Sequence, residues 1–458
     1  MQQGRSGPHE GWSSRIVFLM AAVGAAVGLG NLWKFPYTAG VNGGAAFVLV
    51  YVAAVALVAV PIVIAELLIG RRGRLSPPNS FMALAREAGA SPAWRLVGWM
   101  NLLAVFLILS FYSVIAGWAI AYVPKISMGH FTGATAEQVT AQFDALLASP
   151  VRLALLHALF MAITVSIVAV GLKRGIERAV RLLMPTLLVM LIALVLYAAI
   201  AGDLPRALNF LFQADFSKIS APVVLQAIGQ AFFSVSVAMG LLITYGAYLD
   251  RNVRLGSSAV YIAGADTLVA LLSGLAIFPL VFANGLDPAQ GPGLIFVTLP
   301  IAFGHMPAGA LFGALFFLLV LVSAITSSIA ILEPVVSWAE EHDWMRRGPA
   351  AMIAGFIAWL VGLATVFSFN LWAGWFPLGS FERFRESTVF DLIDYFTSSL
   401  LLPLGGMLIA VFVGWVLSAE TTREELGVAD NLPFRAWRFS MRFIAPLAVG
   451  WVLIANVI

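Results

Sequence analysis

Glycines and oxygen-bearing side chains interrupt the apolar chain at two places, and both can coordinate a cation. The first is GAAVGLGNLWKFPY at residues 24–37, where glycines precede Asn31. The second is GQAFFSVSVAMG at residues 229–240, which contains Ser234 and Ser236. Glycine and proline weaken a helix by about 1 and about 3 kcal/mol, so each stretch predicts a local break. An unwound segment frees carbonyl oxygens for a hard cation, and its helix ends attract an anionic group.

The alternative interpretation is that these glycines are small-residue contacts between packed helices. It is the better one for a lone Gly-x-Gly. However, the two interruptions fall in the first and the sixth of the apolar segments, which correspond to each other in two five-segment halves. Interrupted helices at matching positions of two halves indicate a transporter binding site near the middle of the membrane.

The elements that must position these residues are membrane-spanning helices. The chain has 458 residues, of which 61% are hydrophobic and 11% are charged, whereas soluble domains are about 25% charged. Apolar runs of membrane-spanning length predict one all-α polytopic bundle of eleven spans at roughly 14–38, 43–70, 94–124, 151–171, 175–201, 221–249, 256–283, 308–340, 349–370, 390–418 and 434–457. The chain has no cysteine, which excludes disulfides and thiolate metal sites. We find no spacing typical of a catalytic metal or of a nucleophile with its base.

The charged residues predict the orientation. Most of the 26 lysines and arginines fall in the segments that face one side, together with the N-terminus. By the positive-inside rule this side is the cytoplasm. An odd number of spans then places the C-terminus outside. The Gly- and Pro-rich outer segment 284–307 cannot span, and we expect it to dip into an outer vestibule.

Four stretches of this chain resemble the neurotransmitter:sodium symporters, in their bacterial amino-acid-transporting branch. They are GAAVGLGNLWKFPY, NGGAAFVLVYV, GQAFFSVSVAMG and SAITSSIAILEP, and the resemblance extends from about Trp12 to the last span. It implies an inverted five-helix repeat with broken helices 1 and 6. The implied parts are a cytoplasmic tail at 1–13, repeats at 14–201 and 221–418, and an additional eleventh helix at 434–458.

The resemblance also implies two sodium sites. The first, beside the substrate, would use the Ala26 carbonyl, Asn31, Ser234 and Asp266, completed by the substrate carboxylate. The second would use the carbonyls of Gly24, Val27 and Ser323 and the hydroxyls of Thr326 and Ser327. Asp266 replaces the asparagine usual in the family, and an ionisable group in mid-membrane is costly unless it meets a cation. The alternative is that Asp266 only pairs with a polar neighbour.

Animal members of the family use a chloride near the first sodium. Its ligands would map to Tyr51, Gln230, Ser234 and Asp266. Because a carboxylate on Asp266 supplies the negative charge itself, we expect transport to be independent of chloride. A further hypothesis is that Asp266 takes up a proton when the site is empty, which would give proton counter-transport.

The implied substrate site binds a carboxylate through the amides near Leu29 and Gly30, the first sodium and the Tyr112 hydroxyl. Monoamine carriers have aspartate at the position of Gly28, so its absence indicates a substrate with its own carboxylate. The whole set is Ala25, Ala26, Gly28, Leu29, Gly30, Ile108, Phe111, Tyr112, Phe233, Ser234, Ser236, Met239, Ser327 and Ile331. Its side-chain pocket is almost entirely apolar, which predicts neutral hydrophobic amino acids. Met239 is adaptable and favours admission of aromatic ones.

The resemblance further implies two gates. Lys34 and Asp394 would pair at the outer gate, with Phe233 closing over the substrate. Lysine replaces the usual arginine and cannot form the same bidentate clamp. At the inner gate, Trp12 and Arg15 would lie near Tyr248, and His9 would face Glu341.

Two further residue sets accompany the gates. The spacing of Gly175 and Pro185 implies local unwinding of helix 5, which would admit water to the second sodium. We interpret Glu66 as structural, hydrogen-bonded near the unwound first helix.

The expected function is sodium-coupled import of neutral hydrophobic L-amino acids by alternating access. The partners would be the amino acid and the lipid bilayer of a bacterial inner membrane, without nucleic acid or an obligate protein partner. Two alternatives remain open: an amino-acid sensor that binds without transport, and a proton-coupled carrier. We expect no enzymatic activity.

Overall fold

The computed structural model describes residues 11–457, except for 214, 290–292 and 343–344. The described residues form helices and connecting segments without a strand. In the described part of the chain, nine continuous helices are long and apolar enough to span a membrane, or up to ten if a bent pair is one span. Six of them each contain one α-helix: α6 (Arg95–Ser127), α8 (Pro150–Ala169), α9 (Arg178–Ala201), α13 (Leu255–Ala283), α15 (Gly309–Glu341) and α16 (Arg347–Ser368). The other three each contain two α-helices joined by a π-helical turn: α3 (Ala45–Ala54) with α4 (Val60–Gly73), α17 (Val389–Asp394) with α18 (Leu402–Val411), and α20 (Leu432–Phe439) with α21 (Ala445–Val457).

The sixth predicted span is two shorter helices, α11 (Ala221–Ser234) and α12 (Leu241–Ala247). Neither is long enough to cross a bilayer alone. The described helices therefore support nine or ten spans by length and composition. The count of eleven stays a prediction.

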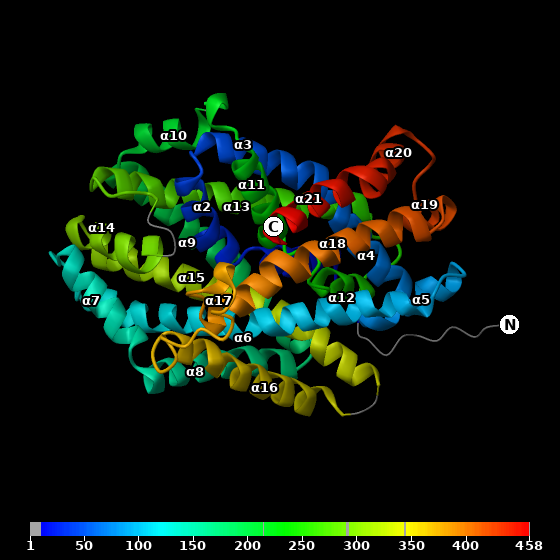
Figure 1. The fold of residues 1–458 in the computed structure, drawn as a ribbon, viewed down its shortest axis with the longest axis horizontal. Coiled ribbons are helices and arrows are strands. Elements are labelled where there is room, and N and C mark those ends of the chain that lie inside the picture. The colour runs from blue at the N-terminus through cyan, green and yellow to red at the C-terminus, as the bar shows by residue number, and fades with distance from the viewer. Residues whose placement is uncertain (1–10, 214, 290–292, 343–344, 458) are drawn as a thin grey trace.

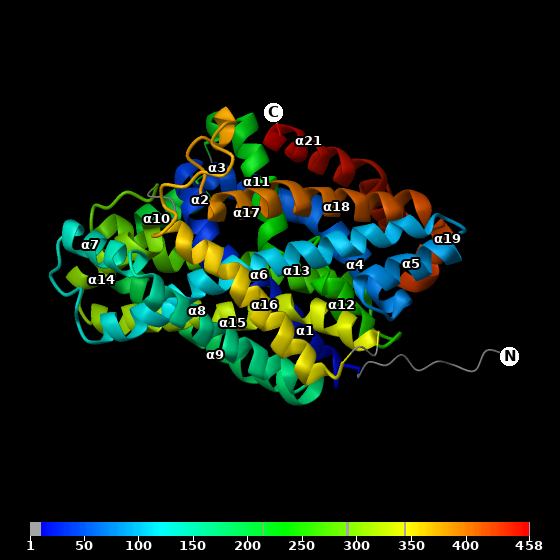
Figure 2. The same ribbon diagram turned by 60° about the horizontal axis from the view of Figure 1, so that its bottom comes forward.

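The spanning helices run roughly along the long axis of the molecule (Figures 1 and 2). In both views one end carries the short helices α7 (Ala136–Leu147), α10 (Leu204–Phe212) and α14 (Leu299–His305), and the opposite end carries α5 (Pro77–Glu87) and α19 (Ala419–Leu426). The most apolar windows of α15 and α6 are 83% and 78% buried, against 28% in the last spanning helix. Hence α6 and α15 form the centre, and α20 and α21 lie at the periphery.

The first spanning helix is broken near its middle, as the glycines predict. The α1 helix (Arg15–Ala26) ends where Val27 adopts extended angles, and the chain resumes at Gly30 with a π-helical turn, η1 (Gly30–Lys34), followed by α2 (Phe35–Val41). The two halves are bent by 48°. Residues 27–29 thus present their backbone groups to the middle of the bundle.

The sixth segment is broken between Ser234 and Leu241, again at the predicted place. Here Ser236, Ala238 and Gly240 have positive φ angles of 58°, 65° and 72°. Non-glycine residues adopt this conformation only where the surrounding structure holds them in it.

Two buried side chains hold Ala238 in its left-handed conformation. Glu66 of α4 accepts a hydrogen bond from the Ala238 amide at 3.0 Å, and Asn101 of α6 donates to the Ala238 carbonyl. Our expectation that Glu66 bonds near the first break is therefore wrong, although its structural role stands. The left-handed conformation directs the Ala238 N–H toward α4, where the Glu66 carboxylate accepts its hydrogen bond.

The segment from Gly175 to Pro185 is helical in this structure. A π-helical turn, η4 (Leu172–Glu177), contains Gly175, and Pro185 lies inside α9. A π-helical turn already departs from regular α geometry. Unwinding beyond this turn stays a prediction.

Candidate functional site

A buried polar cluster joins the two breaks to α13. Asn31 Nδ2 donates to Asp266 Oδ1 at 2.7 Å and to Ser234 Oγ at 3.0 Å, and Ser234 Oγ donates to Asp266 Oδ2 at 2.6 Å. The three side chains are fully buried. Asn31 Oδ1 also accepts from the Gly28 amide at 3.2 Å, which places the side chain against the first break. Three of the side chains assigned to the first sodium site therefore lie in mutual contact.

The four residues that map to a chloride site are only partly in contact. Tyr51 donates to Ser234 Oγ at 3.0 Å and lies 3.5 Å from Asp266 Oδ2. Gln230 instead donates to the Gly30 carbonyl at 2.9 Å. The carboxylate of Asp266 thus contacts Tyr51 and Ser234, but among the described residues it forms no hydrogen bond with Gln230.

The residues assigned to the second sodium site lie between α1 and α15. Ser327 Oγ donates to the carbonyls of Gly24 and Val27 at 3.2 and 3.1 Å. On α15, Thr326 Oγ1 donates to the Ser323 carbonyl at 2.9 Å. All five atoms assigned to this site are uncharged oxygens, and a hard cation prefers oxygen ligands.

Tyr112 reaches the first break from α6. Its hydroxyl accepts a hydrogen bond from the Leu29 amide at 3.3 Å. A Cβ atom built on Gly28 would lie 2.6 Å from Ser327 Oγ and 2.8 Å from the Tyr112 hydroxyl. No side chain fits at position 28 without displacing a polar group on each side, so glycine is required there by close approach.

The predicted side-chain pocket is buried and mostly apolar. Ile108, Phe111, Met239 and Ile331 are each at most 4% exposed, and Ser236 is 7% exposed. Ala25 is 1% exposed, and its neighbour Ala26, whose carbonyl is assigned to the first sodium site, is 4% exposed. Phe233 is half-buried, and its ring lies 3.2 Å from a Cβ built on Gly30. The side chains predicted to line the substrate pocket are thus mostly apolar and buried.

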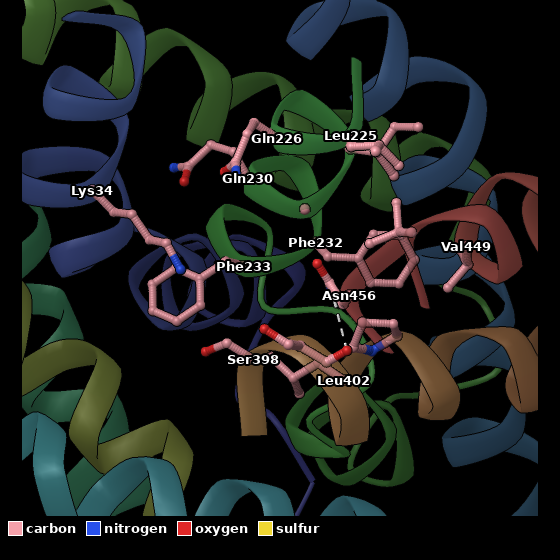
Figure 3. A pocket seen from close by; sticks show the side chains of 15 residues that line it. Lys34, Leu225, Gln226, Gln230, Phe232, Phe233, Ser398, Leu402, Val449 and Asn456 are labelled. Carbon is pink, nitrogen blue, oxygen red and sulfur yellow. Dashed lines mark hydrogen bonds between the residues drawn. The ribbon is translucent and has the colours of Figure 1, made fainter. Parts of the chain in front are cut away.

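Lys34 lies over the ring of Phe233. Its Nζ is 4.1 Å from the ring centroid, which is cation–π geometry. Among the described residues no ion pair joins Lys34 to Asp394, whose Oδ1 accepts from Ser398 at 2.8 Å. Lys34, Phe233 and Ser398 help to line a cavity of about 120 Å³ (Figure 3). The predicted outer pair is therefore not closed in this structure.

The opposite end is closed by Trp12. Its backbone N–H donates to the Tyr248 carbonyl at 3.2 Å, and its indole Nε1 donates to the Tyr245 carbonyl at 3.0 Å. The indole packs edge-on against the Tyr245 ring at 5.1 Å and is 7% exposed. Trp12 and Tyr248 are thus adjacent, as predicted. Arg15 lies elsewhere, where it donates to Ser257.

Glu341 bonds to the segment before and within α5. It accepts from the Ser76 amide at 2.7 Å and from Asn79 Nδ2 at 3.1 Å. The predicted facing residue, His9, lies outside the described residues. The contacts of Glu341 thus tie the end of α15 to α5.

Sequence reasoning missed two ionic groups at this end. Glu333, fully buried in α15, accepts from the Tyr248 hydroxyl at 2.7 Å and pairs with Arg347. Glu177 binds Ser13 through both carboxylate oxygens, at 2.8 Å to its amide and 2.6 Å to its hydroxyl. The available signal was a glutamate inside each apolar segment, because a buried carboxylate requires a partner.

Comparison with known proteins gives concordant results. A family model described as "Sodium:neurotransmitter symporter family" matches residues 9–138 and 139–458. An uncharacterized sodium-dependent transporter of Bacillus subtilis is 36% identical over 96% of this chain and 95% of its own. The sodium- and chloride-dependent creatine transporter 1 of Bos taurus is 23% identical over 98% of this chain and 77% of its own. The solved structure of MhsT in complex with L-phenylalanine has a TM-score of 0.88 and 42% identity, covering 98% of this chain and all of that chain.

Proposed function

Because this chain belongs to the sodium:neurotransmitter symporter family and is a multi-pass, sodium-dependent membrane transporter rather than an enzyme, we propose that it imports neutral hydrophobic L-amino acids. Import is coupled to two sodium ions and independent of chloride. The N-terminus faces the cytoplasm and the C-terminus the outside. Transport proceeds by alternating access, in which spans 1, 2, 6 and 7 rock against a scaffold of spans 3, 4, 8 and 9. The spans belong to five-helix repeats at 14–201 and 221–418, and 434–458 is an additional helix.

The observation that carries this proposal is the arrangement around Gly28. Tyr112 lies against the Leu29 amide, and there is no room for a side chain at position 28. A substrate amine there finds no protein carboxylate of the kind that monoamine carriers supply, so the substrate brings its own. Its carboxylate meets the Tyr112 hydroxyl, backbone N–H groups of the first break and the first sodium ion.

The apolar lining of the pocket selects substrates with hydrophobic side chains. A polar or charged group loses its hydration against Ile108, Phe111 and Ile331 without gaining a partner. Met239 adjusts its shape, so aliphatic and aromatic side chains both fit. The relative MhsT was solved with L-phenylalanine, an amino acid of this class, which supports the same assignment for this chain.

The sodium ions enter as co-transported substrates. One lies against Asn31, Ser234, Asp266 and the substrate carboxylate, so that ion and amino acid complete each other's binding. The other lies between α1 and α15. Each positive charge that crosses the membrane gains about 2.3 kcal/mol per 100 mV, which drives uptake against a gradient.

The test is uptake of labelled leucine and tryptophan into proteoliposomes under an inward sodium gradient, with potassium-only controls, in the presence and absence of chloride. Uptake that requires sodium and not chloride is expected. Sodium-dependent binding without accumulation would instead identify a sensor. Uptake indifferent to sodium would refute both sodium assignments and would lead to a test of proton coupling.

A further inference from the structure

A polar cavity at the periphery of the molecule lies apart from the transport site. It has a volume of about 560 Å³ and lies between the start of α1 and the start of α13. Its lining residues are Ser14, Arg15, Asp250, Asn252, Val253, Arg254, Ser257 and Tyr261. This is the end of the bundle that the charge distribution predicts to face the cytoplasm. The proposed transport mechanism assigns no role to the cavity.

The cavity lies at the boundary between the apolar belt and the polar end of the bundle. Directly beside Arg15, Ile16 is 67% exposed, and on α13 Val260 and Tyr261 are 59% and 61% exposed. Exposed apolar side chains in spanning helices face lipid tails. The charged groups at the helix starts therefore lie at the depth of the phospholipid headgroups.

One arginine of the cavity is held in place. Arg15 donates from Nη2 to Ser257 Oγ at 2.9 Å, and its guanidinium lies 5.8 Å from the centroid of the Tyr261 ring. These contacts use the edge and the face of the guanidinium group, and Arg15 forms no ion pair among the described residues. Its positive charge is thus oriented but not neutralised.

The second arginine and the acid of the cavity have no side-chain partner among the described residues. Within the part of the chain that the structure describes, the Arg254 guanidinium and the Asp250 carboxylate form neither a hydrogen bond nor an ion pair, although both line the same cavity. Two cations and one anion that do not pair with each other form a site for a group that carries both charges.

We propose that this cavity binds the headgroup of an ethanolamine phospholipid. Arg15 and Arg254 bind the phosphate, for which arginine has suitable forked donors. Asp250 binds the primary ammonium group. A phosphatidylglycerol headgroup has no ammonium for Asp250, and a choline headgroup has no N–H to donate. The acyl chains follow the exposed faces of α1 and α13, so the lipid connects these two helices.

The experiment is native mass spectrometry of the full-length protein in detergent, titrated separately with phosphatidylethanolamine, phosphatidylglycerol and phosphatidylcholine. The first bound ethanolamine lipid should be retained best. Arg254→Gln should lower its occupancy about fivefold, the effect of losing one arginine near a headgroup. Arg254→Lys keeps the charge and should retain most of the binding. Equal occupancy by all three lipids would overturn the proposal.

Two further variants separate this site from general charge effects. Asp250→Asn should remove the preference for ethanolamine over glycerol headgroups while phosphatidylglycerol still binds. Arg251→Gln is the matched control, because Arg251 lies in the same loop but lines a separate cavity with Glu424 and Glu425. A loss for Arg251→Gln as large as that for Arg254→Gln would refute the site.

A soluble ligand of the same chemistry is distinguished by competition. Glycerophosphoethanolamine has the headgroup without acyl chains. At millimolar concentration it should displace little of the bound lipid, because the chains contribute binding along α1 and α13. Complete displacement would show that the cavity is a site for a water-soluble phosphate ester, and the proposed lipid would be wrong.

Discussion

The break in the first spanning helix contains no residue with a left-handed backbone, whereas the break in the sixth contains Ser236, Ala238 and Gly240 in that conformation. The first depends on close approach, since Gly28 leaves space for Ser327 and Tyr112. The second depends on two buried side chains that hold Ala238 from both sides. The two breaks thus expose backbone groups in different ways. The first lacks a side chain at Gly28, and the second has a strained backbone at Ala238 that neighbouring side chains stabilise.

The largest effect should come from filling the first break. Gly28→Ala places a Cβ within 2.8 Å of two oxygens, and overpacking of this kind costs about 1–3 kcal/mol. We expect sodium-driven uptake to fall roughly tenfold to a hundredfold at fixed substrate concentration. Gly264→Ala is the control, because nothing lies within 4 Å of a Cβ at Gly264. Uptake unchanged in Gly28→Ala would mean that close approach is not what the first break requires.

The next effect tests the cluster that joins the breaks. Asp266→Asn keeps the shape but removes the charge beside Ser234 and Asn31. Uptake in chloride-free buffer should then fall about tenfold, equivalent to about 1.4 kcal/mol, and chloride should restore it. Wild-type uptake measured in the same two buffers is the control. A variant that stays indifferent to chloride would argue that Asp266 does not substitute for an anion.

A smaller effect should come from releasing one side of the second break. Asn101→Ala removes the hydrogen bond to the Ala238 carbonyl, and a typical hydrogen bond contributes about 1 kcal/mol net to stability. Thermal unfolding in detergent should shift downward accordingly. Asn79→Ala removes a part-buried amide that bonds Glu341 instead and serves as the comparison. If Asn101→Ala were as stable as the wild type, Glu66 alone would hold the break.

The smallest effect should be a gain. Ala238→Gly removes the steric cost of a left-handed alanine, about 1–2 kcal/mol. Glycine loses more backbone entropy on folding than alanine, which costs about 0.5–1 kcal/mol. The net expectation is a rise of about 0.5 kcal/mol in the free energy of unfolding. Ala231→Gly, inside helical α11, has no strain to relieve and should be destabilised. Destabilisation of both variants alike would show that Ala238 is not strained.

Both breaks could be predicted from local sequence, because glycine and serine in an apolar run weaken the helix at their own positions. The sodium, substrate and gate residues came from the resemblance to a family, since contacts such as Ser327 with Gly24 join positions 303 residues apart. The Glu66–Ala238, Asn101–Ala238 and Glu333–Arg347 contacts were not predicted. A carboxylate in an apolar segment indicates that a partner is required. Which backbone N–H or arginine is that partner depends on how the helices pack.

The hydroxyl of Ser327 has a consequence for ion release. Its oxygen lies within hydrogen-bonding distance of the carbonyls of Gly24 and Val27, at 3.2 and 3.1 Å, and these two oxygens belong to the second sodium site proposed above. At the proposed second sodium site the serine would therefore compete with the ion. An arriving sodium ion would rotate the hydroxyl away, and the hydroxyl would return when the ion departs. Such an exchange lowers the barrier to dissociation at the cost of affinity, which is what a carrier that discharges its ion in every cycle requires.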